Sequence, residues 1–190
     1  VSGVESFVAD SLQPALPLTG QASLRVSDGD VELAATLRND SDVTLEDATL
    51  LVGSTAVPLG DLAPGAQVNK TQIIGAAGTV ASATGMPALS FGPSFGSPLL
   101  MNTETILGTS DYYNDRSAFP RWQLLQALED ESGMAATVTA AVTLVAWTEQ
   151  PQVEAALVAG ENGRAATTLY LIEIPLDQQF SGGQMTVPLT

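Results

Sequence analysis

Apolar and polar residues alternate on both sides of an Asp-Gly dipeptide early in the chain. Leu24 and Val26 precede Asp28-Gly29, and every second residue from Val31 to Leu37 is apolar. A period of two places one row of side chains on a single face of a strand. Asp-Gly suits the positive φ angles of a two-residue turn. The pattern therefore predicts a β-hairpin, beginning at Gln21, with one buried face.

Further short apolar segments follow, separated by turn residues. Segment 138–147 is apolar on both faces, as a central strand covered on each side would be. Several short strands joined by tight turns are typical of a sandwich or a barrel. We therefore predict a mostly β chain, with an α+β arrangement as the alternative. The other expected strands are 43–52, 55–59, 67–74, 153–159, 165–176 and 185–189, with a hairpin turn at Asn162-Gly163.

One amphipathic helix is expected from Ser117 to Glu131. Apolar residues recur there at helical spacing, Ser117 is a suitable N-cap, and Gly133 can end the helix. The apolar residues that define its buried face are Phe119, Trp122, Leu124, Leu125 and Leu128. Trp122 and Trp147 are both expected in the core.

The stretch from Thr71 to Thr103 contains no charged residue but many glycines and prolines. It is too broken for a long helix and too apolar for an ordinary linker. Short strands near Thr79–Ala83 and Leu99–Ile106 are one interpretation. Phe91 and Phe95 must pack either against the rest of the chain or against a partner protein, since exposed apolar surface of that size usually marks an interface.

Charge and composition exclude several classes of function. The 21 acidic residues outnumber the six basic ones, which gives a net charge of −15 and argues against binding nucleic acids or anionic lipids. The chain has no Cys and no His. The G-x-S-x-G pattern at 92–96 therefore lacks the usual base of a serine hydrolase. We predict a non-catalytic protein without a cofactor.

Calcium or carbohydrate binding is the alternative to a protein-binding role. Asp and Asn gather at 28–30, 39–42 and 111–115, and their oxygens are the ligands that Ca²⁺ prefers. The same residues are also what turns commonly use. Tyr112 and Tyr113, next to the last cluster, are expected to form a small exposed contact patch.

Segments 31–39, 44–48 and 59–65 together resemble bacterial immunoglobulin-like modules, in which a strand ends in an Asn-containing turn and L-G-x-L-x-P-G precedes a later strand. The resemblance covers about residues 21–75. It implies an immunoglobulin-like β-sandwich in an extracytoplasmic setting. Segments 142–147 and 168–176 look like the ends of soluble regions that precede a membrane anchor in bacterial surface proteins.

The expected organisation has four parts. They are an extended lead-in (1–20), the immunoglobulin-like module (21–75), an insertion carrying the helix (76–137), and strands that complete the sandwich (138–190). A second α+β lobe over 76–190 is the alternative. The expected function is a spacer or protein-binding domain of a membrane-anchored bacterial envelope protein, at the cell surface. The candidate partner surface is Phe91, Phe95, Tyr112 and Tyr113.

Overall fold

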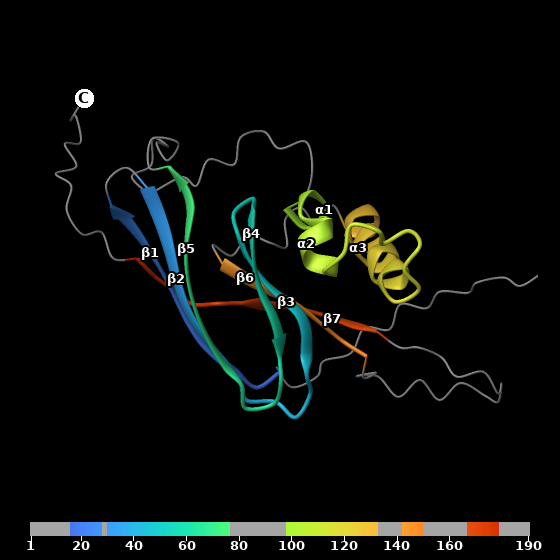
Figure 1. The fold of residues 1–190 in the computed structure, drawn as a ribbon, viewed down its shortest axis with the longest axis horizontal. Coiled ribbons are helices and arrows are strands. Elements are labelled where there is room, and N and C mark those ends of the chain that lie inside the picture. Colours follow the sequence, from blue (N-terminus) through green and yellow to red (C-terminus); the bar gives the residue numbers. More distant parts are fainter. Residues whose placement is uncertain (1–15, 28–29, 77–97, 133–141, 150–166, 179–190) are drawn as a thin grey trace, which may run out of the picture.

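The alternating segments form two four-stranded sheets. The computed structural model describes residues 16–27, 30–76, 98–132, 142–149 and 167–178. One sheet has the strand order β5-β2-β1-β8 and the other β4-β3-β6-β7 (Figure 1). The strands are β1 (Leu18–Ser27), β2 (Asp30–Asn39), β3 (Leu45–Val52), β4 (Thr55–Leu62), β5 (Gln67–Ala76), β6 (Val142–Thr148), β7 (Thr168–Glu173) and β8 (Leu176–Gln178).

The strand order is that of an immunoglobulin-type sandwich. In such sandwiches strands A, B, E and D form one sheet, and strands C, F and G, extended by C′ in the variable type, form the other. Here β1, β2 and β5 take the places of A, B and E, while β3, β4, β6 and β7 take those of C, C′, F and G. All these neighbours are antiparallel, and β8 joins β1 in parallel. The predicted mostly β sandwich is confirmed.

The first hairpin forms as predicted, with a longer first strand. Ser27 lies opposite Asp30, which is the register of a two-residue connection. β1 begins at Leu18, not at Gln21, because Leu18 pairs with Asn39 and Gly20 with Leu37. Residues 18–20, expected in the lead-in, therefore belong to the sheet.

The predicted strand 165–176 is divided between the two sheets. β7 pairs with β6 up to Glu173, and β8 then pairs with β1 from Leu176. Between them, the Ile174 N–H donates to Val142 O and the Ala22 N–H donates to Pro175 O. Pro175 has no N–H to give to a ladder, so the strand changes partner at this point.

The main core lies between the sheets and follows the period of two. The inward residues of β2 alternate strictly with more exposed ones. The largest fully buried residues of this main core come from both sheets and are Leu33, Leu37, Leu45, Leu50, Val57, Val142 and Leu144.

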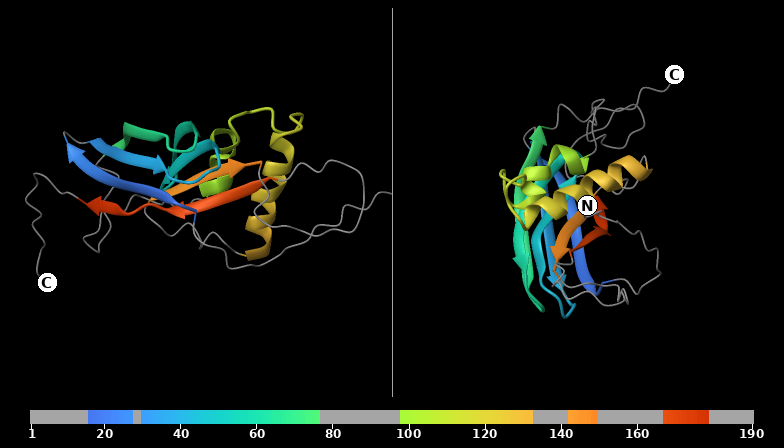
Figure 2. Two further views of the ribbon diagram at one scale, coloured as in Figure 1. Left: turned by 90° about the horizontal axis from the view of Figure 1, so that it is seen from below. Right: turned by 90° about the vertical axis from the view of Figure 1, so that its right-hand side faces the viewer.

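Three helices cover the outer face of the β4-β3-β6-β7 sheet. They are α1 (Pro98–Met101), α2 (Thr103–Leu107) and α3 (Ala118–Ser132), and α3 crosses the strand direction (Figure 2). A second core, defined by Leu51, Leu99, Ile106, Leu107, Leu125, Val145 and Trp147, joins them to the sheet. Every residue of β6 is consequently buried, as predicted for a central strand covered on both faces.

The expected strand at Leu99–Ile106 is wrong, because this segment forms α1 and α2. Pro98 suits the first position of a helix. The Asn102 side chain donates both to Pro98 O (2.8 Å) and to Ser54 O (3.1 Å), which ties the helices to the β3–β4 turn. Gly108 ends α2 in the left-handed conformation.

Asn39, at the end of β2, fastens three segments together. Its Nδ2 donates to Val43 O and Leu62 O, both at 2.8 Å, and its Oδ1 accepts from the N–H and the hydroxyl of Ser41. Asn39 is completely buried. The Asn-containing turn of the sequence pattern is therefore a buried clasp between β2, the start of β3 and the end of β4.

Several sequence predictions lie outside the described residues. These are the strands near 79–83, 153–159 and 185–189, the turn at Asn162-Gly163, the G-x-S-x-G segment, and Phe91 and Phe95. None of the helices within the described ranges has the length and apolarity needed to cross a bilayer.

Candidate functional site

A bulge in β3 places two acidic side chains next to α3, at the end of the molecule that carries the three helices, which we call the helical end. The pairing of β3 is shifted between Leu45 and Thr49 against β4 and between Glu46 and Thr49 against β6. Within this segment Asp47 adopts a φ of 48°. The Asp47 N–H donates to the Asp61 carboxylate at 3.0 Å. A bulge redirects side chains, and here Glu46 and Asp47 both reach Arg121 of α3.

Arg121 is a buried charge with two acidic partners. Its residue exposure is only 6%. Nη1 lies 2.8 Å from Asp47 Oδ2, Nη2 donates to Glu46 Oε2, and Cζ lies 5.4 Å from the centroid of the Trp147 ring. Trp147 in turn donates from Nε1 to Ile106 O at 2.9 Å. These contacts join α2 and α3 to β3 and β6 by polar bonds as well as by packing.

Asp47 has mixed electrostatic surroundings. Burial raises the pKa of the Asp47 carboxyl above its usual value. The carboxylates of Asp61 and Glu46 act in the same direction, and the Arg121 guanidinium opposes them. The positive charge of Arg121 thus offsets the repulsion between the Glu46 and Asp47 carboxylates and the cost of their partial burial.

Gly108 packs directly against this ion pair. Its φ is +68°, and a Cβ at Gly108 would lie 2.5 Å from Asp47 Oδ1. Gly108→Ala is expected to lower the free energy of unfolding by about 2 kcal/mol or more, as measured by urea denaturation. The left-handed conformation alone costs an L-residue roughly 1–2 kcal/mol, and the new methyl group also displaces the Asp47 carboxylate.

Gly65→Ala is the matched control for this substitution. Gly65 has a φ of +75°, and nothing lies within 4 Å of its Cβ position. It therefore carries the conformational cost alone. Equal losses in the two variants would contradict a role for the contact between Gly108 and Asp47.

The start of α3 is capped by Asp115 and not by Ser117, which corrects the predicted N-cap. Asp115 Oδ1 accepts from the Ser117 N–H (2.8 Å), the Ser117 hydroxyl (2.6 Å) and the Ala118 N–H (3.2 Å). These hydrogen bonds lower the pKa of the Asp115 carboxyl. Asp and Ser are both good N-caps. Asp115 takes the role here because its carboxylate accepts from the free N–H groups of Ser117 and Ala118.

Four aromatic side chains from the first turns of α3 and the segment before it contact one another. We call them the aromatic cluster: Tyr112, Tyr113, Phe119 and Trp122. The ring centroids of Tyr112 and Tyr113 are 4.5 Å apart, and those of Tyr113 and Trp122 are 4.9 Å apart in an edge-on arrangement. Trp122 also stacks on Phe119 at 5.6 Å and on Tyr112 at 6.0 Å. Such pairs are mutually attractive, so the cluster holds its own shape.

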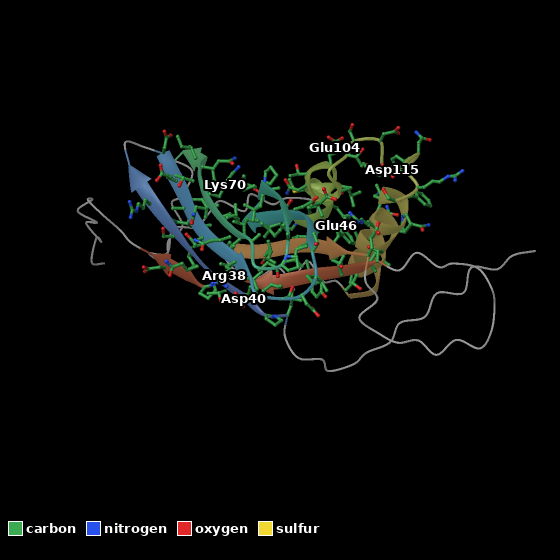
Figure 3. All side chains as sticks on the ribbon, turned by 60° about the horizontal axis from the view of Figure 1, so that its bottom comes forward. Arg38, Asp40, Glu46, Lys70, Glu104 and Asp115 are labelled. Atoms are coloured by element: carbon green, nitrogen blue, oxygen red, sulfur yellow. The ribbon has the colours of Figure 1, made fainter. Side chains whose placement is uncertain are left out.

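The aromatic cluster is rooted in the second core and open to solvent outside. Tyr112 and Trp122 pack against that core, whereas Tyr113 is 59% exposed. A hydrogen bond with the Tyr113 side chain raises the pKa of the Tyr112 phenol, and the charge of Glu104 adds to this shift. Figure 3 shows Glu104 and Asp115 at the same helical end of the molecule.

The structure brings Tyr112 and Tyr113 together, as the expected contact patch requires. It adds two residues that were assigned to the buried helix face, Phe119 and Trp122, both of which are half-buried. Trp147 is completely buried, as predicted. The signal for the larger cluster was present in the i, i+3 spacing of Phe119 and Trp122 just after the two tyrosines.

The Asp/Asn turns use their side chains locally. Asp40 accepts from Thr19 and pairs with Arg38 at 2.8 Å, and Asp111 accepts from Asn114 at 2.7 Å. Among the described residues, no group of three or more acidic side chains is placed to hold a metal ion.

A family model matches most of the chain. Residues 20–179 match the model of a domain of unknown function, DUF8725. The chain belongs to this family. The DUF8725 match runs from β1 to β8, so it includes the helices and the aromatic cluster as well as the sandwich. No curated protein and no solved structure matches the chain.

Proposed function

We propose that this chain is a non-catalytic, extracytoplasmic protein-binding module of a bacterial envelope protein, and that the aromatic cluster is its contact surface. The observation that carries the proposal is a set of four packed aromatic rings at the surface, with Tyr113 59% exposed. Tyr and Trp are enriched among the residues that dominate binding energy in protein interfaces. The extracytoplasmic setting rests on the resemblance of residues 21–75 to bacterial surface modules.

The anchoring of the cluster supports the proposal. Rigid contact residues lose little conformational entropy on binding. Trp122 lies one residue after Arg121, whose guanidinium is held by Glu46 and Asp47. The cluster is therefore fixed to the sandwich by an ion pair, a cation–π contact and the second core. This arrangement presents aromatic surface without rearrangement.

A photo-crosslinking experiment tests the proposal. The photoreactive amino acid p-benzoylphenylalanine replaces Tyr113 in the full chain, which is then irradiated in intact cells of the organism of origin. Ile73 is the matched control position, because its exposure (60%) is close to that of Tyr113 (59%) and it lies on β5 of the other sheet. We expect one discrete protein adduct from position 113 and none from position 73.

The affinity for the captured protein gives the quantitative result. Tyr113→Ala is expected to weaken binding about 30-fold, the factor that corresponds to the roughly 2 kcal/mol of a hot-spot residue. Ile73→Ala should leave the affinity within about 2-fold. The same adduct from both positions, or no adduct from position 113, would refute the aromatic cluster as the contact surface.

A further inference from the structure

The outer face of the β5-β2-β1-β8 sheet carries a polar hollow of about 260 Å³. It lies on the side of the sandwich opposite to the helices, because the helices cover the outer face of the other sheet. Its lining comes from β1, β2, β5 and β8. Figure 3 shows Lys70, which also borders the hollow, on the strands and away from Glu104 and Asp115.

Strand register explains why the sheet is hollowed here. Ser23 lies opposite Ala34 and beside Asp177, and Ala34 lies opposite Thr71. Small side chains therefore form one continuous row across the sheet. Since side chains two residues apart share a face, the next row along the strands also points outward. That row consists of Gln21, Thr36 and Asn69, which are in register with one another and are longer than the Ser–Ala–Thr floor.

A second wall follows from the same register on the other side of the floor. Arg25 lies two residues after Ser23 and opposite Glu32. The two walls are four residues apart along β1, which corresponds to roughly 13 Å. Four strands span roughly 14 Å across the sheet. The row of small residues is thus the floor of a short groove that runs across the strands, wide enough for a sugar ring.

The lining chemistry selects the ligand. Ser23, Thr36 and Thr71 contribute hydroxyl groups, and Gln21 and Asn69 contribute amides, as residues that both donate and accept hydrogen bonds. Arg25 adds a donor at one wall and Asp177 an acceptor at the end of the floor. The residues in direct contact with the hollow include no aromatic or large aliphatic side chain. Ile73, which is opposite Glu32 and 60% exposed, lies at the β5 end of the second wall, so an apolar ligand would gain contact only at that margin. The backbone groups of β1 and β2 are used in the ladders, so side chains do the binding.

We propose that this groove binds a saccharide. Hydroxyl groups on a sugar ring donate and accept in the same way as the amides and hydroxyls of the lining, and they also match the guanidinium and carboxylate at its margins. The site is independent of the aromatic cluster, since the two lie on opposite outer faces of the sandwich. A chain with both sites holds a protein partner on one face and a glycan on the other.

An NMR titration tests this proposal. The ¹⁵N-labelled chain is titrated separately with cellobiose, chitobiose and maltose up to about 20 mM, which detects a dissociation constant on the order of 1–10 mM. We expect at least one of the three to shift the amide signals of Ser23, Ala34 and Thr71. Ala34→Leu fills the floor of the groove and is expected to weaken that binding at least 10-fold. Ala127→Leu, at an exposed position of α3, is the control and should leave it unchanged.

Three results would overturn the proposal. They are no shift with any of the three sugars, shifts that persist in Ala34→Leu, and shifts that appear at Tyr113 and Trp122 instead of the groove. The last result would place a sugar on the aromatic cluster. The titration needs no protein partner, so its outcome is separate from that of the crosslinking experiment.

Discussion

Arg121→Ala is expected to lower the free energy of unfolding by about 3 kcal/mol, measured by urea denaturation. Removing one member of a buried ion pair typically costs 3–5 kcal/mol because the remaining charge keeps its desolvation penalty without a partner. Here two carboxylates lose their cation. Their side chains are 30% and 34% exposed, and solvent therefore reduces the penalty to the low end of that range.

Two further variants separate charge from other effects. Arg116→Ala removes an exposed arginine at the same end of the molecule, and it should change the stability by less than about 0.5 kcal/mol. Arg121→Met keeps most of the aliphatic volume that packs near Trp147. We expect it to recover only a minor part of the loss. If Arg121→Ala were as stable as the native chain, the ion pair would not be what anchors α3.

Asn39→Ala is expected to cost a similar amount, about 3 kcal/mol. The substitution removes the Asn39 amide that donates to Val43 O and Leu62 O, and it leaves Val43 O with only the longer hydrogen bond from the Ser41 hydroxyl at 3.2 Å. Each buried polar group left unpaired costs roughly 1–3 kcal/mol. The Ser41 N–H loses its acceptor in the same step, and the Ser41 hydroxyl loses the shorter of its two acceptors. Thermal and urea denaturation of the variant measure the loss.

Asn69→Ala is the matched control, because Asn69 is exposed on β5 and accepts one hydrogen bond from Thr36. Its expected cost is below about 0.5 kcal/mol. Asn39→Asp preserves the shape but turns a donor into an acceptor that faces two carbonyl oxygens, and it should be at least as damaging as Asn39→Ala. Equal stability of the Asn39→Ala and Asn69→Ala variants would show that the clasp contributes nothing.

The strands were predictable where one face is buried and turn residues mark the ends. β2 and β6 show this best, because alternation in one and apolar residues on both faces in the other correspond directly to one covered face and two. Helix α3 was also predictable from its i, i+3 spacing. These features depend on local pattern, which a single sequence contains.

The contacts of the helical end could not be predicted in the same way. Arg121 looks like an ordinary surface arginine in a helix, and its partners Glu46 and Asp47 are more than 70 residues away in the chain. The bulge that aims them depends on two neighbouring strands. α1 and α2 are too short for a clear period, and their stability depends on packing against β3 and β6. The contacts of Arg121 and the formation of α1 and α2 therefore depend on residues far apart in the chain, which a local sequence pattern does not reveal.

The second core makes the helical segment 98–132 a structural part of the domain. Helices inserted between strands E and F of a sandwich would ordinarily be removable, as surface loops often are. Here their removal would uncover Leu51, Val145 and Trp147, three side chains that are essentially absent from the present surface. A shortened sandwich would then display a broad apolar sheet face and would tend to self-associate. The insertion is thus an obligatory wall of the domain, and truncation or loop grafting has to stop short of residues 98–132.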